Sequence, residues 1–152
     1  MAIGTVYPEI ITAEVVRQLL DAQGLAFYSS EDRGFAIPFS DHVVYLDSRN
    51  FDDGTIMWHI NTRWSRCINM RYIAEAKNAV QEWHARTYMP KLIYSIDDDG
   101  FIRFHAIWTF AWEFGVTHEQ ASAALQSGIY LMGVVLEHLE SYFPDRWKET
   151  DQ

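Results

Sequence analysis

The segment "YSIDDDGFIRFH", residues 94–105, decides the fold of the second half of the chain. Three consecutive aspartates and Gly100 separate two apolar runs, a composition typical of a turn between two strands. Residues directly opposite each other in an antiparallel pair share one face of the sheet. A two-residue loop would place Ile96 opposite Arg103, whereas a three-residue loop places Ile96 opposite Ile102. The sequence therefore predicts a hairpin with a three-residue loop, in which Gly100 takes the left-handed conformation.

The same aspartates invite a calcium-loop interpretation, which the spacing does not favour. If Gly100 is the sixth loop position, the ligand positions one, three and five fall on Ser95, Asp97 and Asp99. The twelfth position, which needs a bidentate glutamate, falls on Ala106. We therefore interpret the aspartates as a turn.

Outward from the hairpin, the sequence predicts three helices and several further strands. A helix at roughly 68–87 precedes the hairpin, and another runs from the capping box "THEQ" (117–120) to about Phe143. A first helix opens at Thr12 and ends at Gly24. The strand-like runs between the first two helices are "LAFYS", "FAIPF", "HVVYL" and "TIMWHINTRW", separated by the turn-rich "EDRG", "SD" and "NFDDG". The predicted class is α+β: an antiparallel sheet of five or so strands with three helices, in the order helix–strands–helix–two strands–helix, as one domain over residues 1–152.

Two apolar segments near the end of the chain suggest contacts with other molecules. The run "GIYLMGVVL", residues 128–136, is apolar nearly all round, so we expect its helix to be buried on more than one side. We expect another subunit to cover the second side. The run "WTFAWEFG", residues 108–115, is expected to leave its strand partly exposed, with Trp112 as a partner anchor.

Charge and composition narrow the functional classes. The net charge of −9 argues against a nucleic-acid surface, which needs a basic face. Only residues 63–91 are basic, with six basic and two acidic side chains; either they form a solvated helix, or they contact an acidic partner or a second copy. One cysteine and no leader-like or membrane-spanning segment favour the cytoplasm.

The polar face of the predicted sheet carries the candidate binding residues. His59 and His105 fall on it together with Arg63 and Arg103, and form either a recognition surface or a plain solvent-facing sheet. A zinc site would lack a third ligand, so no metal is expected. The candidate partner-binding residues are His59, Arg63, Arg103, His105 and Trp112.

The remaining reactive side chains form no catalytic motif, and we expect neither an enzyme nor a cofactor. His84, His118 and His138 lie on helices at no ligand spacing and are expected to be surface imidazoles. Cys67 either has its pKa lowered by Arg66 and a helix N-terminus or is a small half-buried residue.

Residues 80–120 resemble the YbjN family, whose members are described as bacterial sensory transduction regulators with a fold like that of type III secretion chaperones. The matching features are Trp83 at the end of a helix, Pro90-Lys91 opening a strand, the acidic turn at Gly100 and "GVTHEQ" opening the last helix. The resemblance implies a small α+β protein that is often dimeric, binds other proteins and has no established chemistry. The residue after Trp83 is His84 where the family has asparagine, so no role is carried over to it.

Together these observations lead to two functional hypotheses. The first is a non-enzymatic, chaperone-like adaptor that forms a homodimer and holds a protein or peptide segment. The alternative is a sensor domain whose aromatic interior forms a pocket for a small ligand. Neither hypothesis involves nucleic acid or a membrane.

Overall fold

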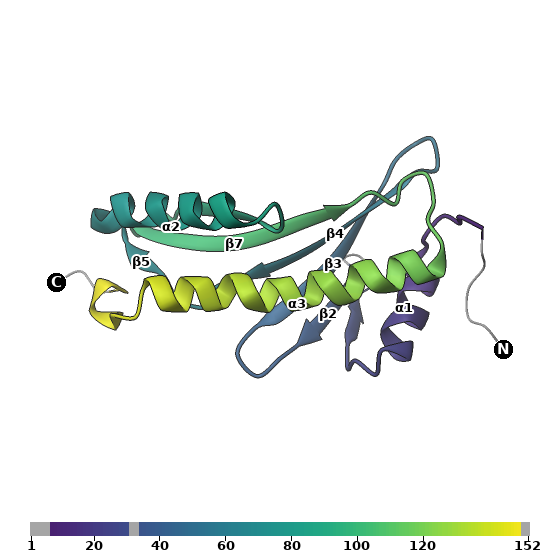
Figure 1. Cartoon of the computed structure of the whole chain (residues 1–152), viewed down its shortest axis with the longest axis horizontal. Helices are drawn as coiled ribbons and strands as arrows, with labels where there is room; N and C mark the ends of the chain where they lie inside the picture. The colour runs from purple at the N-terminus through teal and green to yellow at the C-terminus, as the bar shows by residue number, and fades with distance from the viewer. Residues whose placement is uncertain (1–6, 31–33, 150–152) are drawn as a thin grey trace. The chain divides into compact units, whose positions relative to one another are not determined.

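The computed structural model describes residues 7–30 and 34–149, and its helices and strands are labelled in Figure 1. The predicted "EDRG" turn therefore lies outside the described residues except for Gly34. The elements are α1 (Ala13–Ala22), β1 (Tyr28–Ser30), β2 (Gly34–Pro38), β3 (Val43–Asn50), β4 (Ile56–Arg63), β5 (Ile68–Asn69), η1 (Met70–Tyr72), α2 (Ile73–Arg86), β6 (Lys91–Ile96), β7 (Phe101–Phe110), α3 (His118–Tyr142) and η2 (Arg146–Glu149).

The described residues confirm the predicted α+β class and element order. Three α-helices accompany one antiparallel sheet, whose strand order is β1-β2-β3-β4-β7-β5 with β6 also paired to β7. The described sheet has seven strands, which are the six strand-like runs of the sequence and the two-residue β5 inside the segment predicted as helix.

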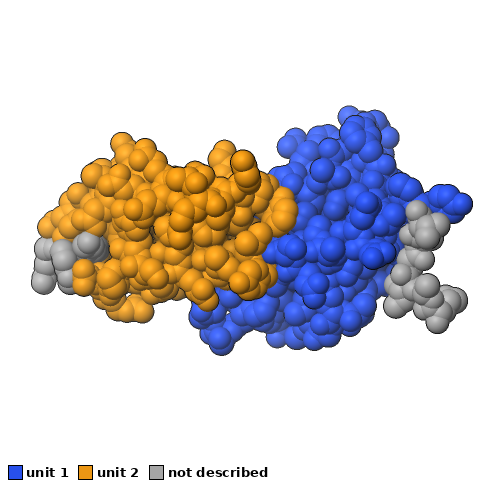
Figure 2. Space-filling view, viewed as in Figure 1, with its two compact units in different colours: residues 1–60, 109–129 blue, residues 61–108, 130–152 orange. Residues whose placement is uncertain are grey.

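The chain divides into two compact units, coloured in Figure 2. Unit 1 comprises Met1–Ile60 and Thr109–Ile129, and unit 2 comprises Asn61–Trp108 and Tyr130–Gln152. The elements β4, β7 and α3 contribute residues to both units.

The hairpin between β6 and β7 has the predicted register. Ile96 lies opposite Ile102, and Tyr94 lies opposite Phe104. The Asp97 N–H donates to the Phe101 carbonyl at 2.8 Å and closes the loop, while Gly100 has φ 83°. The Asp97 carboxylate accepts from the Asp99 and Phe101 N–H groups at 3.0 and 2.9 Å. The aspartates are thus a turn, as the register argument predicts.

Substitution in this turn gives a first prediction. Gly100→Val should destabilise the protein by about 2 kcal/mol, because a β-branched residue tolerates a left-handed backbone badly. Asp98→Asn changes only a charge in the same loop and should shift stability by less than about 0.5 kcal/mol. Urea titrations of both variants test this prediction, and equal small losses would contradict the assigned turn.

Unit 1 is built around α1 and the first four strands. The Thr12 hydroxyl accepts from the Val15 N–H at 3.3 Å, which caps α1 as the sequence predicts. At the other end, Gly24 has φ 71° and follows the last helical turn. Trp58 is 1% exposed in the core, and its indole N–H donates to the Ile11 carbonyl at 2.8 Å.

Helix α2 in unit 2 begins later than predicted, at Ile73 instead of residue 68. Ile68 pairs with Ile102 of β7, and this pairing holds the preceding segment extended. The Asn69 side chain then accepts from the Arg71 N–H at 3.0 Å and starts the short 3-10 helix η1. The period of the apolar residues alone does not reveal this pairing.

Helix α3 begins with the predicted capping box. The Thr117 N–H donates to the Gln120 side-chain oxygen at 3.0 Å, and the Gln120 N–H donates to the Thr117 hydroxyl at 3.1 Å. Within unit 2, Met132 and Val135 of α3 are fully buried, but Tyr130 is 70% exposed. Within the described chain the apolar centre of α3 is therefore covered on one side only.

The prediction that the run "WTFAWEFG", residues 108–115, is partly exposed is wrong for two of its aromatic residues. Phe110 and Trp112 stack with ring centroids 4.4 Å apart and are 2% and 3% exposed. The period of two that buries Phe104 continues to both residues, so their rings point into the core of unit 1. Phe114, which is 91% exposed, and the half-buried Trp108 fit the expectation, whereas Trp112 is buried and cannot serve as a surface anchor.

Candidate functional site

Three of the five predicted binding residues gather on the sheet of unit 2. Arg63 is the last residue of β4, and Arg103 and His105 alternate with buried residues along β7. The side chains of all three therefore lie on the face of the sheet opposite the core. Together they border a hollow of about 350 Å³, which we call the basic hollow. Its lining residues are Arg63, Trp64, Ser95, Arg103, Phe104 and His105.

The electrostatics of the basic hollow are dominated by positive charge. Burial lowers the pKa of His105, and the neighbouring Arg63 guanidinium lowers it further, because both disfavour the imidazolium. Arg103 donates from Nε to the Asp97 carboxylate at 3.1 Å. The backbone N–H of Phe101 and this contact hold the pKa of Asp97 below its usual range.

The other two predicted binding residues belong to unit 1. His59 lies with its Nε2 3.6 Å from the Asp47 carboxylate. Trp112 is buried, as described above. The expected five-residue surface is therefore divided between the two units.

The three helix histidines are not plain surface imidazoles, contrary to the sequence-based expectation. His84 Nε2 accepts from the Leu92 N–H at 3.0 Å, and His118 lies 2.9 Å from the Glu9 carboxylate in unit 1. His138 lies between α2 and α3, where its ring centroid is 5.5 Å from that of Trp83. Each imidazole thus joins its helix to another segment of its own unit.

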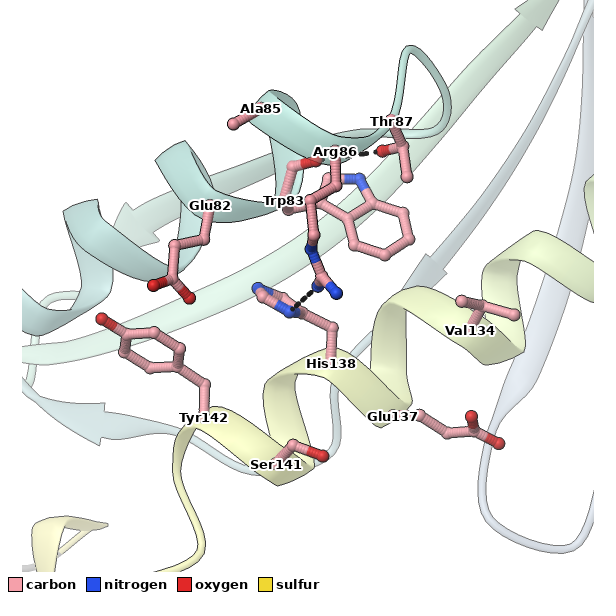
Figure 3. A pocket seen from close by; sticks show the side chains of 10 residues that line it. All are labelled: Glu82, Trp83, Ala85, Arg86, Thr87, Val134, Glu137, His138, Ser141 and Tyr142. Atoms are coloured by element: carbon pink, nitrogen blue, oxygen red, sulfur yellow. Dashed lines mark hydrogen bonds between the residues drawn. The ribbon is translucent and has the colours of Figure 1, made fainter.

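A second concave surface lies between α2 and α3 in unit 2 and is shown in Figure 3. This α2–α3 cleft has a volume of about 770 Å³. Its walls combine aromatic surface with charged and hydroxyl groups. The lining residues are Glu82, Trp83, Ala85, Arg86, Thr87, Val134, Glu137, His138, Ser141 and Tyr142.

The polar groups of the α2–α3 cleft are held in fixed positions. His138 Nε2 lies 2.8 Å from the Ala79 carbonyl, which can only accept, so Nε2 carries the proton. Arg86 donates from Nη2 to His138 Nδ1 at 2.7 Å, as the dashed line in Figure 3 marks. Trp83 donates from its indole to the Pro90 carbonyl at 2.7 Å. These bonds fix the positions of the Arg86, His138 and Trp83 side chains at the cleft wall.

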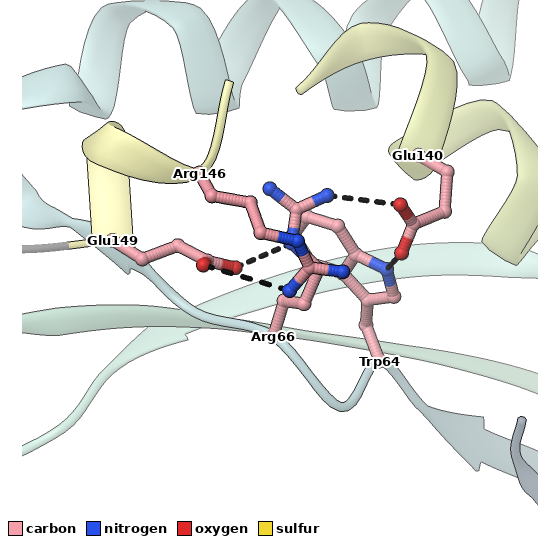
Figure 4. A network of polar contacts seen from close by, with 5 residues as sticks. All are labelled: Trp64, Arg66, Glu140, Arg146 and Glu149. Atoms are coloured by element: carbon pink, nitrogen blue, oxygen red, sulfur yellow. Dashed lines mark hydrogen bonds and ion pairs between the residues drawn. The ribbon is translucent and has the colours of Figure 1, made fainter. Parts of the chain in front are cut away.

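A charged network in unit 2, drawn in Figure 4, holds η2 beside α3. Arg66 is 7% exposed and donates to Glu140 at 2.9 Å and to Glu149. The Trp64 indole donates to the other Glu140 oxygen at 3.0 Å, and the Arg66 guanidinium lies 4.7 Å from the Trp64 ring centroid. Sequence reasoning missed this network because its members are far apart along the chain.

The described residues show no arrangement that suggests metal binding or nucleophilic catalysis. No group of three or more histidine, cysteine, aspartate or glutamate residues in the described ranges could hold a metal ion. Burial raises the pKa of the half-buried Cys67 thiol, and α2 begins only at Ile73. Of the two interpretations of Cys67, the structure favours a half-buried residue over an activated thiol.

None of the helices, over the residues that the structure describes, is both long enough and apolar enough to cross a bilayer.

The fold and its site features define a small α+β protein with a cleft between α2 and α3 and a basic hollow on the sheet of unit 2. Residues 12–144 match the YbjN family, described as "Putative bacterial sensory transduction regulator", and the chain belongs to this family. That description names no catalytic function.

Comparison with solved structures gives the same fold. The chain is similar to the crystal structure of YbjN from E. coli, described as "a putative transcription regulator", with 18% sequence identity and a TM-score of 0.62. The similarity covers 86% of this chain and 93% of that one. No curated protein matches this chain.

Proposed function

We propose that the protein is a non-enzymatic, chaperone-like adaptor that binds a polypeptide segment in the α2–α3 cleft. The observation that carries this proposal is the outward stripe of α3 in unit 2. Tyr130 is 70% exposed, Val134 lies one turn further, and the stripe continues into the cleft through His138. An exposed aromatic side chain leading into a mixed apolar and polar cleft is typical of a protein-binding surface.

The chemistry of the cleft supports a polypeptide ligand. Arg86 provides donors on the α2 side, and Glu137 and Ser141 provide polar groups on the α3 side. The half-buried Tyr142 offers aromatic surface, while Trp83 is buried behind the cleft wall. A peptide needs both kinds of contact, because its backbone hydrogen-bonding groups accompany apolar side chains.

A second copy of the chain is a further candidate for the exposed side of α3. The homodimer we propose would bury Tyr130 and Val134, which the chain itself leaves exposed or half-buried. Light scattering at working concentration tests this part separately, since a monomer there would rule out the dimer and leave the adaptor hypothesis standing.

The adaptor proposal is tested by affinity capture with matched variants. Val134→Lys places a charge in the cleft wall, and Ala123→Lys places the same charge at an exposed position elsewhere on α3. We expect one protein from the native extract to be enriched in near-stoichiometric amount by the wild type and by Ala123→Lys. It should be lost with Val134→Lys. Equal capture by both variants would contradict a role for the cleft.

The volume of the cleft favours a second candidate function, a small-ligand sensor. About 770 Å³ falls in the size range of small-molecule sites. Native mass spectrometry of the purified protein tests this candidate, and a bound small molecule that disappears in Val134→Trp would support it.

A further inference from the structure

The basic hollow collects donor groups from three neighbouring strands. The Trp64 N–H donates to the Phe104 carbonyl at 3.1 Å, and this contact places Arg63 opposite His105 on neighbouring strands. On the other side of β7, Ser95 of β6 lies opposite Arg103. Two guanidinium groups, one imidazole and one hydroxyl therefore border the same hollow.

Most of these donors have no acceptor on the protein. Within the described ranges, the side chains of Arg63, Ser95 and His105 make no hydrogen bond or ion pair. Arg103 uses its Nε for Asp97, which leaves both terminal nitrogens of its guanidinium available. The Asp97 carboxylate partly offsets the charge of Arg103, with which it is paired.

The charge of the whole protein makes this cluster unusual. The chain carries a net charge of −9, which repels anions in general. Within the described ranges Arg63 and His105 have no carboxylate partner, and Arg103 engages Asp97 only through its Nε, so the hollow is locally more positive than the protein as a whole. Such a site attracts an anion only at short range, where hydrogen bonds add to the charge.

We propose that the basic hollow is a binding site for a phosphate-class oxyanion, held by Arg63, Arg103 and His105. Two guanidinium groups, one imidazole and one hydroxyl line it, and this number of donors suits the three terminal oxygens of a phosphomonoester better than the two oxygens of a carboxylate. Its volume of about 350 Å³ leaves room for the atoms attached to the phosphoryl group. This site is separate from the α2–α3 cleft and goes beyond the proposed adaptor function.

Binding at this site couples to protonation of His105. The charged groups that face the imidazole are Arg63 on β4, and Arg103 with its partner Asp97 on the hairpin. In the free protein, burial and Arg63 lower the pKa of His105. A bound dianion offsets the Arg63 charge and favours the imidazolium, so binding should raise the pKa of His105 and should itself strengthen as the pH falls toward about 6, the second pKa of a phosphomonoester.

The experiment follows the His105 ring signal of the full chain by NMR during titration with inorganic phosphate, phenyl phosphate and benzoate. Sodium chloride keeps the ionic strength constant. We expect saturable binding of a phosphate species with an upward shift of the His105 pKa, and no saturable binding of benzoate. Preference for phenyl phosphate identifies an ester as the ligand, and preference for inorganic phosphate identifies the free ion; both support the site.

Matched variants locate the effect. Arg63→Gln should bind phosphate about tenfold more weakly, because one charge-assisted contact is lost. Lys77→Gln removes the same charge from an exposed position on α2 and should bind like the wild type. Arg63→Gln without ligand should also show a higher His105 pKa, which checks the assigned contact independently. Non-saturable shifts, benzoate binding as tight as that of phenyl phosphate, or unchanged binding in Arg63→Gln would each overturn the proposal.

Discussion

Gly34→Ala is expected to destabilise the protein by about 3 kcal/mol or more, the largest effect of any single methyl group considered for this chain. Gly34 opens β2 with φ 94°, and a Cβ there would lie 2.1 Å from the Leu46 carbonyl oxygen of β3. Backbone atoms cannot rotate aside as a side chain can. Alanine would therefore force β2 and β3 apart where Phe35 pairs with Leu46.

The matched control is Gly54→Ala, in the turn between β3 and β4. Gly54 has φ 87°, but a Cβ there meets no atom within 4 Å. Its expected cost is the backbone strain alone, about 1–2 kcal/mol. Urea unfolding of both variants separates strain from collision. Equal losses of stability in the two variants would show that β2 accommodates the methyl group. The short distance to the Leu46 carbonyl oxygen would then add no cost beyond the backbone strain.

Arg66→Ala is expected to cost about 3 kcal/mol, the second large effect. The arginine side chain is 6% exposed and joins Glu140 of α3 to Glu149 of η2, as Figure 4 shows. Its loss leaves the two carboxylates near each other without their shared cation and removes the guanidinium from the face of Trp64. We expect chemical unfolding at lower urea concentration and faster proteolysis within η2.

Arg146→Ala provides the control in the same network. Its guanidinium lies 3.9 Å from Glu149, but its side chain is 73% exposed, so the expected change is below about 0.5 kcal/mol. Arg66→Lys keeps the charge without the planar fork and should recover only part of the loss. If Arg66→Ala lowers the free energy of unfolding no more than Arg146→Ala does, the burial of Arg66 adds nothing to the stability of the network.

The parts of the fold that the sequence predicts well depend on neighbouring residues. The hairpin register follows from the alternation around Ile96 and Ile102, and the capping box at Thr117 needs only residues within one turn. The start of α2 was misplaced because β5 forms only when Ile68 meets Ile102 of β7. Pairing between distant segments is not encoded in local periodicity.

The candidate binding residues could likewise be predicted only where local periodicity is enough to place them. Arg63, Arg103 and His105 were found because period two assigns each to the polar face of its strand. Their grouping in one hollow could not be predicted without the pairing of β4 with β7. The expectation for Trp112 is wrong because the apolar alternation of β7 continues through Phe110, its last residue, to Trp112, which lies just past the end of the strand.

The bond between His84 and Leu92 bears on how copies of this chain behave at high concentration. In the described sheet β6 pairs only with β7, so its other side is an open edge that could add a strand from another molecule. The Leu92 N–H points to that edge, but His84 already occupies it at 3.0 Å. An incoming strand could not bond to the Leu92 N–H, so this contact shortens the stretch of β6 on which another strand could pair. One imidazole on α2 thereby limits strand addition at this edge of the sheet.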